Sequence, residues 1–176
     1  MNATGAFAEL LSFVDQRLPR KPDGSPDLER EQSDVVHDLL AFLAEEMTRL
    51  HQEKQAEVKG FLHWLEGYLG IKLDDLKNKT KVKEYWREDI GWEGFIDALK
   101  QNKRAIHTAS GIDVTRREPR DDKIRPEFDT SIARLRPLLE RIELTDRLID
   151  HIVYRLYGLT EEEVAVVEGR SQYTSP

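Results

Sequence analysis

The residues that come nearest to a nuclease site are Asp121-Asp122-Lys123. Metal-dependent nucleases of the common restriction type carry an Asp on one strand and an acidic residue two positions before a Lys on the next. An Asp that follows a proline, at Asp23 or Asp27, would supply the first half. The surrounding residues are not strand-like, however, and such a run arises by chance where 35% of the residues are charged. We therefore interpret 121–123 as a solvated loop.

Arg30 and His37 indicate a second kind of chemistry. This pair is similar to the Arg and His of HEPN-like helical ribonucleases, which lie a few residues apart at a helix start and activate a ribose hydroxyl. His37 would act as the general base near neutral pH. Glu31 replaces the polar residue usual after the Arg, and its charge would repel a phosphate. Two side chains that simply face water are the other interpretation, and the ribonuclease stays an alternative prediction.

Metal and cofactor sites are not predicted. The histidines are scattered, without a His-x-x-x-His or Glu-x-x-His pair. The chain has no cysteine, which excludes disulfides and thiolate ligands. It also has no Gly-x-Gly and no Pro-Pro, so the cofactor turn and the base-gripping signature of an adenine-specific methyltransferase are both missing. We expect a chain that is not an enzyme and that binds no metal and no cofactor.

The net charge of −7 is unevenly distributed. Lys and Arg number 7 against 13 acidic residues in 1–71, 14 against 11 in 72–125, and 6 against 10 in 126–176. An acidic protein binds phosphate backbones poorly, so any contact with nucleic acid is expected in the basic middle segment. Such contacts would position DNA without reading its sequence. The candidate phosphate contacts are Lys77, Lys79, Lys81, Lys83, Lys103, Arg104, Arg116, Arg117 and Arg120.

The tryptophans divide by their surroundings. Trp86 and Trp92 flank the basic run 77–83, and they are the aromatic residues we consider for stacking on bases. Trp64 shares helical spacing with Phe61 and Tyr68, which predicts a core position for Trp64.

The apolar residues indicate the elements that must position these side chains. Their helical spacing predicts an N-terminal helix in 1–18 and two long helices at about 28–69 and 127–157. A proline-rich linker, 19–27, separates the first two. Gly158 is expected to end the last helix in a left-handed conformation, because glycine has no Cβ to clash there.

Smaller features complete the predicted fold. Thr160 to Glu163 forms a capping box for a short final helix, and Gly70 is expected to cap the first long helix. Leu43 and Leu139 are expected in one seam between the long helices. No stretch alternates with period two.

The prediction is therefore an all-α fold, an elongated antiparallel pair of long helices with short helices packed alongside. The helical module spans 28–169 and contains a basic connector, 72–125, whose last part from Asn102 is expected to be long and exposed. Residues 170–176 are predicted to form a flexible tail. No window is apolar enough for a membrane span, and no signal peptide is present, so we expect a cytoplasmic protein.

The segment 144–163 carries a resemblance to a known family. Its run D-R-x-I-D-x-I-V-Y-x-L-Y-G-L-T-x-E-E resembles the closing segment of bacterial type IIG restriction-modification enzymes, which join a nuclease, an adenine-specific DNA methyltransferase and a target-recognition region. Segments 61–65, 76–80 and 92–100 are similar to the helical region before that closing segment. The resemblance covers about 28–168.

The resemblance implies a non-catalytic helical module that supports DNA target recognition or subunit assembly, within a larger enzyme or beside a methyltransferase subunit. None of the family's methyl-transfer residues can be carried over, because their motifs are missing. Two alternatives stay open: a structural helical hairpin that binds another protein, and the HEPN-like ribonuclease. The sequence leaves open whether the chain is complete, which DNA sequence is involved and what the oligomeric state is.

Overall fold

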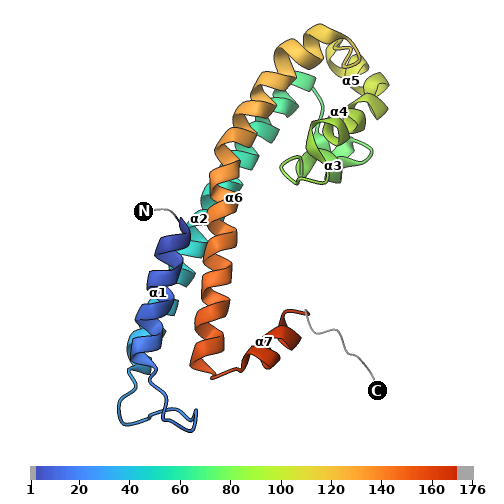
Figure 1. The fold of residues 1–176 in the computed structure, drawn as a ribbon. Helices are drawn as coiled ribbons and strands as arrows, with labels where there is room; N and C mark the ends of the chain where they lie inside the picture. Colours follow the sequence, from blue (N-terminus) through green and yellow to red (C-terminus); the bar gives the residue numbers. More distant parts are fainter. Residues whose placement is uncertain (1–2, 170–176) are drawn as a thin grey trace, which may run out of the picture. The chain divides into compact units, whose positions relative to one another are not determined.

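The computed structural model describes residues 3–169, and the side chains of 5–169 (Figure 1). Within this part the chain forms helices and one isolated β-bridge between Arg20 and Pro26, without a strand, which confirms the all-α prediction. The helices are α1 Ala3–Arg17, α2 Ser33–Leu69, η1 Leu73–Asp75, α3 Lys79–Lys83, α4 Gly91–Gln101, α5 Lys103–Ser110, the π-helix η2 Glu118–Ile124, α6 Arg125–Leu156 and α7 Glu161–Val167. The predicted tail, 170–176, lies outside the described residues.

The first long helix begins later than predicted. Asp27 O accepts hydrogen bonds at 3.0 Å from the backbone N–H groups of both Arg30 and Glu31, which closes a turn after the proline-rich linker. The N–H of Gln32 bonds to the carbonyl of Arg17 at 2.8 Å. These bonds hold 28–32 outside the helix, so α2 starts at Ser33.

The predicted ends of the long helices are confirmed. Gly70 follows α2 at a φ of 66°, and Gly158 follows α6 at 69°, both in the left-handed region that favours glycine. The Thr160 hydroxyl accepts from the Glu163 N–H at 3.3 Å, and the Glu163 carboxylate accepts from the Thr160 N–H at 2.8 Å. This reciprocal pair is the predicted capping box.

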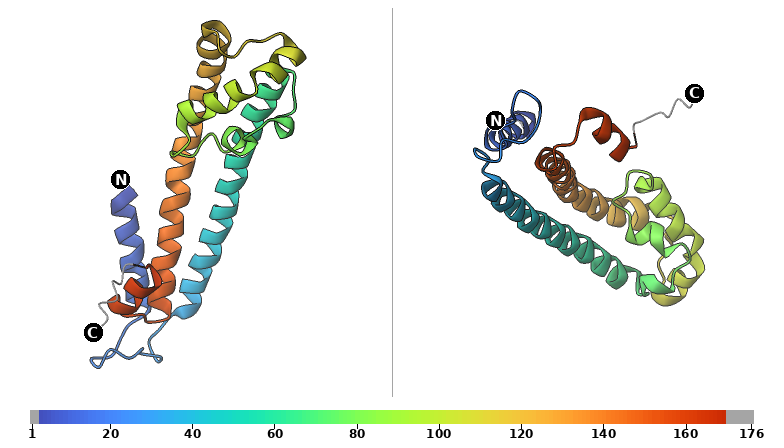
Figure 2. Two further views of the ribbon diagram at one scale, coloured as in Figure 1. Left: turned by 90° about the vertical axis from the view of Figure 1, so that its right-hand side faces the viewer. Right: turned by 90° about the horizontal axis from the view of Figure 1, so that it is seen from below.

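The chain divides into two compact units, 1–49 with 142–176 (unit 1) and 50–141 (unit 2). In unit 1, α1 packs beside the first part of α2 and the last part of α6 (Figure 2). Its buried core is small and aliphatic: Val14, Val36, Leu43, Leu148 and Ile152.

Unit 2 has a larger core that is built around aromatic rings. In Figures 1 and 2 the short helices α3, α4 and α5 gather near the end of α2. Phe61 of α2 lies 4.5 Å from Tyr85 and 5.9 Å from Phe95, measured between ring centroids. Phe128 of α6 completes the group, 5.1 Å from Phe95. The Tyr85 hydroxyl, buried here, hydrogen-bonds the Ser131 hydroxyl at 2.6 Å.

Two expectations are wrong. The stretch from Asn102 to Arg125 is not a long exposed connector: α5 and η2 lie within it, and Ile106, Val114 and Ile124 are buried in the core of unit 2. Sparse apolar residues are sufficient here because α5, the turn after it and η2 each bury only one. Leu43 and Leu139 also do not share a seam, since Leu43 lies in the core of unit 1 and Leu139 packs against that of unit 2.

Candidate functional site

The lysines of the run 77–83 form two pairs with different surroundings. Nζ of Lys79 and Lys83 lies 3.1 and 2.7 Å from Oδ1 of Asp74. Hydrogen bonds from Lys83 and then Lys79 lower the pKa of the Asp74 carboxyl. Lys77 and Lys81 are exposed and form no ion pair within the described chain. Their charges are therefore the more available ones for an external anion.

A buried amide fixes the start of this run. Asn102 follows α4 and is 7% exposed. Its Oδ1 accepts from the Lys77 N–H at 2.9 Å, and its Nδ2 donates to the carbonyls of Lys77 at 2.9 Å and of Ala98 at 2.8 Å. One side chain therefore satisfies both backbone groups of Lys77 and holds the lysine run to the junction of α4 and α5.

Helix α5 forms one wall of a hollow of about 450 Å³, which we call the α5 hollow. Its lining residues are Lys103, Arg104, His107, Thr108, Asp113 and Thr115. Lys103 and Arg104 are exposed and, within the described chain, have no ion-pair partner.

Asp113 is already engaged within this lining. Its Oδ1 accepts from the Thr115 hydroxyl at 2.6 Å and from the Thr115 N–H at 3.1 Å, and its Oδ2 lies 3.4 Å from Arg116 Nε. The bonds from Thr115 come first among the causes that lower the pKa of Asp113.

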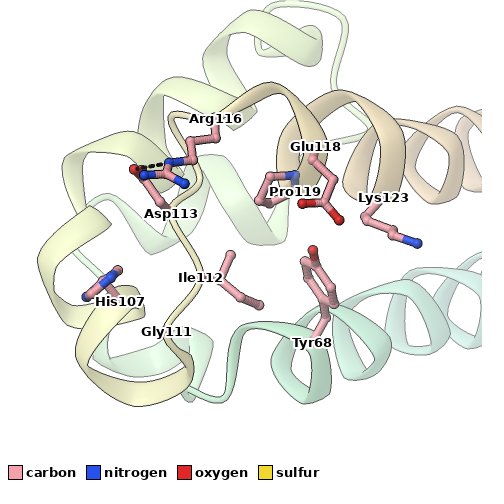
Figure 3. Close-up of a pocket in the computed structure, with 9 residues that line it drawn as sticks. All are labelled: Tyr68, His107, Gly111, Ile112, Asp113, Arg116, Glu118, Pro119 and Lys123. Carbon is pink, nitrogen blue, oxygen red and sulfur yellow. Dashed lines mark ion pairs between the residues drawn. The ribbon is translucent and has the colours of Figure 1, made fainter.

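A second hollow, of about 470 Å³, adjoins the first and shares His107 and Asp113 with it. We call it the Tyr68 cavity, after the ring on the last turn of α2. Figure 3 shows the Tyr68 hydroxyl pointing toward Glu118, with Ile112 to the left of the ring and the Arg116–Asp113 ion pair farther off, at the upper left. Burial, and then the charge of Glu118, raises the pKa of Tyr68.

The π-helix η2 explains why two charged side chains line this cavity. Glu118 and Lys123 lie five residues apart, at either end of the segment. In an α-helix, residues five apart point about 140° away from one another at 3.6 residues per turn. A π-helix instead joins residues five apart by backbone hydrogen bonds, which brings them onto one side. Such segments are frequent at functional sites.

The other predicted arginines lie around the same loop. Arg116 is paired with Asp113, as described above. Arg120 pairs with Asp121 at 2.7 Å, and this bond raises the pKa of Arg120 and lowers that of Asp121. Arg117 is exposed and forms no ion pair within the described chain.

The tryptophans considered for stacking are occupied within unit 2. Lys54 Nζ lies 3.5 Å from the centre of the Trp86 ring, and the guanidinium of Arg125 lies 4.8 Å from that of Trp92. Trp92 also packs edge-on against Phe128 at 5.1 Å. Both indoles are half-buried. These contacts favour a packing role for both.

The remaining candidate chemistry is dispersed. Arg30 lies in the turn before α2 and His37 within the helix, and both side chains are exposed. Residues 121–123 belong to η2, so the acid-x-Lys run is helical and not the predicted loop. Among residues 5–169, no group of three or more histidines and carboxylates is arranged to hold a metal ion. No helix of the described chain is long and apolar enough to cross a membrane.

The sequence interpretation missed the residues that shape the cavity. Tyr68 shares helical spacing with Trp64, and the two rings stack at 5.4 Å with 4° between their planes. Both are only half-buried, however, so Tyr68 also lines the cavity. Glu118 and His107 belong to no motif, and Lys123 stands out only as the end of the acid-x-Lys run. Only the loop and the π-helix bring the three side chains together.

The chain was also compared with known proteins. No family model, no curated protein and no solved structure matches it.

Proposed function

We propose that the chain is a non-catalytic helical module of a type IIG-like restriction-modification system, in which unit 2 contacts DNA phosphates. The observation that carries the proposal is the cluster of Lys103, Arg104, His107 and Arg116 around two adjoining hollows. Unit 2 is also the basic part, with 19 Lys and Arg against 17 acidic residues, whereas unit 1 has 8 against 17. Phosphates would be attracted to unit 2 and repelled by unit 1.

The resemblance of 144–163 supplies the restriction-modification part of the proposal. In this proposal α2 and α6 pair as an antiparallel rod that holds recognition elements at a fixed separation, because base reading in the major groove tolerates little positional error. The module would act in the bacterial cytoplasm, with DNA or a methyltransferase subunit as its partner. The phosphate contacts would position the duplex without specifying its sequence.

Binding to duplex DNA at two salt concentrations, about 50 and 200 mM, tests the phosphate contacts. Each contact adds about 0.9 to the slope of log affinity against log salt, so Lys103→Gln with Arg104→Gln should lower that slope by up to about 1.8. The control is Arg134→Gln with Arg136→Gln on α6, which removes the same charge outside both hollows. Equal slopes for the two double variants would refute the assignment.

The lysine run allows a second matched comparison. Lys77→Gln with Lys81→Gln removes lysines without an ion pair, whereas Lys79→Gln with Lys83→Gln removes the two that pair with Asp74. The first pair should reduce affinity and slope more than the second, because the charges of the second pair are already partly balanced. Equal effects would show that the Asp74 ion pairs do not matter for DNA, and the opposite order would contradict the assignment of Lys77 and Lys81 as the main contacts.

Subunit assembly is a second candidate function, and one observation favours it. The large exposed apolar side chains of the described chain all belong to unit 1: Leu28, Phe42, Tyr157, Val166 and Val167. With its excess of acidic residues, unit 1 would suit a basic protein partner with apolar anchors. Phe42→Ser, at 62% exposure, should weaken copurification with a coexpressed methyltransferase subunit and leave the helical circular dichroism unchanged. Undiminished copurification would remove Phe42 from this role.

A further inference from the structure

The Tyr68 cavity and the α5 hollow together offer three different surfaces to one ligand. Tyr68 and Ile112 provide flat and apolar contact in the cavity, with the Glu118 carboxylate near the phenol hydroxyl (Figure 3). Lys103 and Arg104 provide positive charge in the hollow. His107 and Asp113 line both, so the two spaces meet at these residues.

We propose that this pair of hollows binds a nucleoside phosphate, with its base on Tyr68 and its phosphate at Lys103 and Arg104. The Tyr68 cavity, at about 470 Å³, is within the size range of small-ligand pockets. A base stacks well on an aromatic side chain, and the phenol ring is held from behind by its parallel stack with Trp64. This ligand goes beyond the phosphate contacts proposed above, because its base would be unpaired and would lie against Tyr68.

Glu118 specifies the class of base. No hydrogen bond engages its carboxylate within the described chain, and it lines the cavity close to the ring on which the base would stack. A carboxylate only accepts hydrogen bonds, so it favours a base with an exocyclic amino group over one with a carbonyl at that place. Adenine is therefore preferred over hypoxanthine.

Asp113 lies where the ribose would be. It lines both the Tyr68 cavity, where the base would lie, and the α5 hollow, which Lys103 and Arg104 also line. Thr115 and Arg116 engage its oxygens and hold the carboxylate in place, and an ionised carboxylate has lone pairs left for one further donor. A ribose hydroxyl is such a donor, and carboxylates fill this role in other nucleotide sites.

Calorimetric titration of the full chain with AMP tests the proposal. We expect AMP to bind, and Tyr68→Leu to weaken binding by about fivefold or more, because a base stacked on an aromatic ring contributes about 1–3 kcal/mol. Lys103→Gln with Arg104→Gln should weaken it as well, whereas Lys79→Gln, outside both hollows, should not. No binding at millimolar AMP, or equal binding by the parent and Tyr68→Leu, would overturn the proposal.

Glu118→Ala keeps the test decisive if Tyr68→Leu fails to fold, because Glu118 is exposed. The parent should bind AMP about tenfold more tightly than IMP, as expected for a hydrogen bond to a charged group, and Glu118→Ala should lose this preference. Equal affinities of the parent for AMP and IMP would remove Glu118 from the site.

A free nucleotide and an unpaired nucleotide within a single strand present the same base and phosphate to this site. A 5′-phosphorylated adenine trinucleotide that binds much more tightly than AMP would identify a strand, and equal or weaker binding would identify the free nucleotide. Either result supports the shared site. Failure with AMP is also separable from failure of the proposed function, because the salt slope of duplex binding is measured without any free nucleotide.

Discussion

Asn102→Ala removes the side chain that satisfies both backbone groups of Lys77. Three hydrogen bonds of 2.8–2.9 Å are lost from a residue that is 7% exposed. Each contributes about 0.5–1.5 kcal/mol net, so the free energy of unfolding of unit 2 should fall by about 2–4 kcal/mol. Urea unfolding followed by tryptophan fluorescence measures this change, because all three tryptophans lie within 50–141.

Amide hydrogen exchange gives the local readout for the same variant. The Lys77 N–H should lose protection in Asn102→Ala, while that of Val36, in the core of unit 1, should keep it. The control is Gln55→Ala, an exposed position on α2 that also lies in unit 2. The role of the Asn102 hydrogen bonds would be refuted if Asn102→Ala were as stable as Gln55→Ala and its Lys77 amide stayed protected.

Three further predictions concern other parts of the fold. Gly158→Ala should destabilise the chain by about 1 kcal/mol, because the φ of 69° at this position disfavours a Cβ. Gly60→Ala, within α2, should instead stabilise it by about 0.5–1 kcal/mol, since a Cβ there meets nothing within 4 Å. Thermal melts compare the two. Burial raises the pKa of the Tyr85 hydroxyl to about 12. The protonated hydroxyl therefore stabilises the fold fully below pH 10, and this stabilisation is lost as the pH rises through 12. Urea melts should show the loss in the parent and not in Tyr85→Phe. Leu43→Ala should cost about 2–4 kcal/mol in unit 1, visible by circular dichroism. An unchanged melt in any of these would contradict the corresponding argument.

The long helices and their ends were predictable because their signals are local and repeated. An apolar stripe over many turns predicts α2 and α6. Gly158 acts through its own backbone and Thr160 through a side-chain hydrogen bond three residues away, so both signals are local. Pro137 lies inside α6 and removes one main-chain hydrogen bond, yet the helix continues through it. The apolar stripe continues on both sides of Pro137, so the sequence predicts one helix.

The segment from Asn102 to Arg125 shows why the cavities were not predicted. Its buried residues Ile106, Val114 and Ile124 are far apart in sequence and have no common period. Ile106 lies in α5, Val114 in the turn that follows it and Ile124 at the end of η2, and only the tertiary packing of unit 2 decides that all three point inward. Composition correctly indicated the charge of the segment and gave no information about its shape.

The π-helix η2 also sets the phase of the helix that follows it. α6 begins at Arg125, directly after η2 ends at Ile124, so both belong to one winding of the backbone. Loss of a single residue from 118–124 would turn every later side chain by about 100° relative to the preceding loop, given 3.6 residues per turn. Phe128 and Leu135 would then leave the core of unit 2. Substitutions at exposed positions of this segment are therefore tolerable. A deletion or insertion is not, because it would rotate the side chains of α6 out of the core.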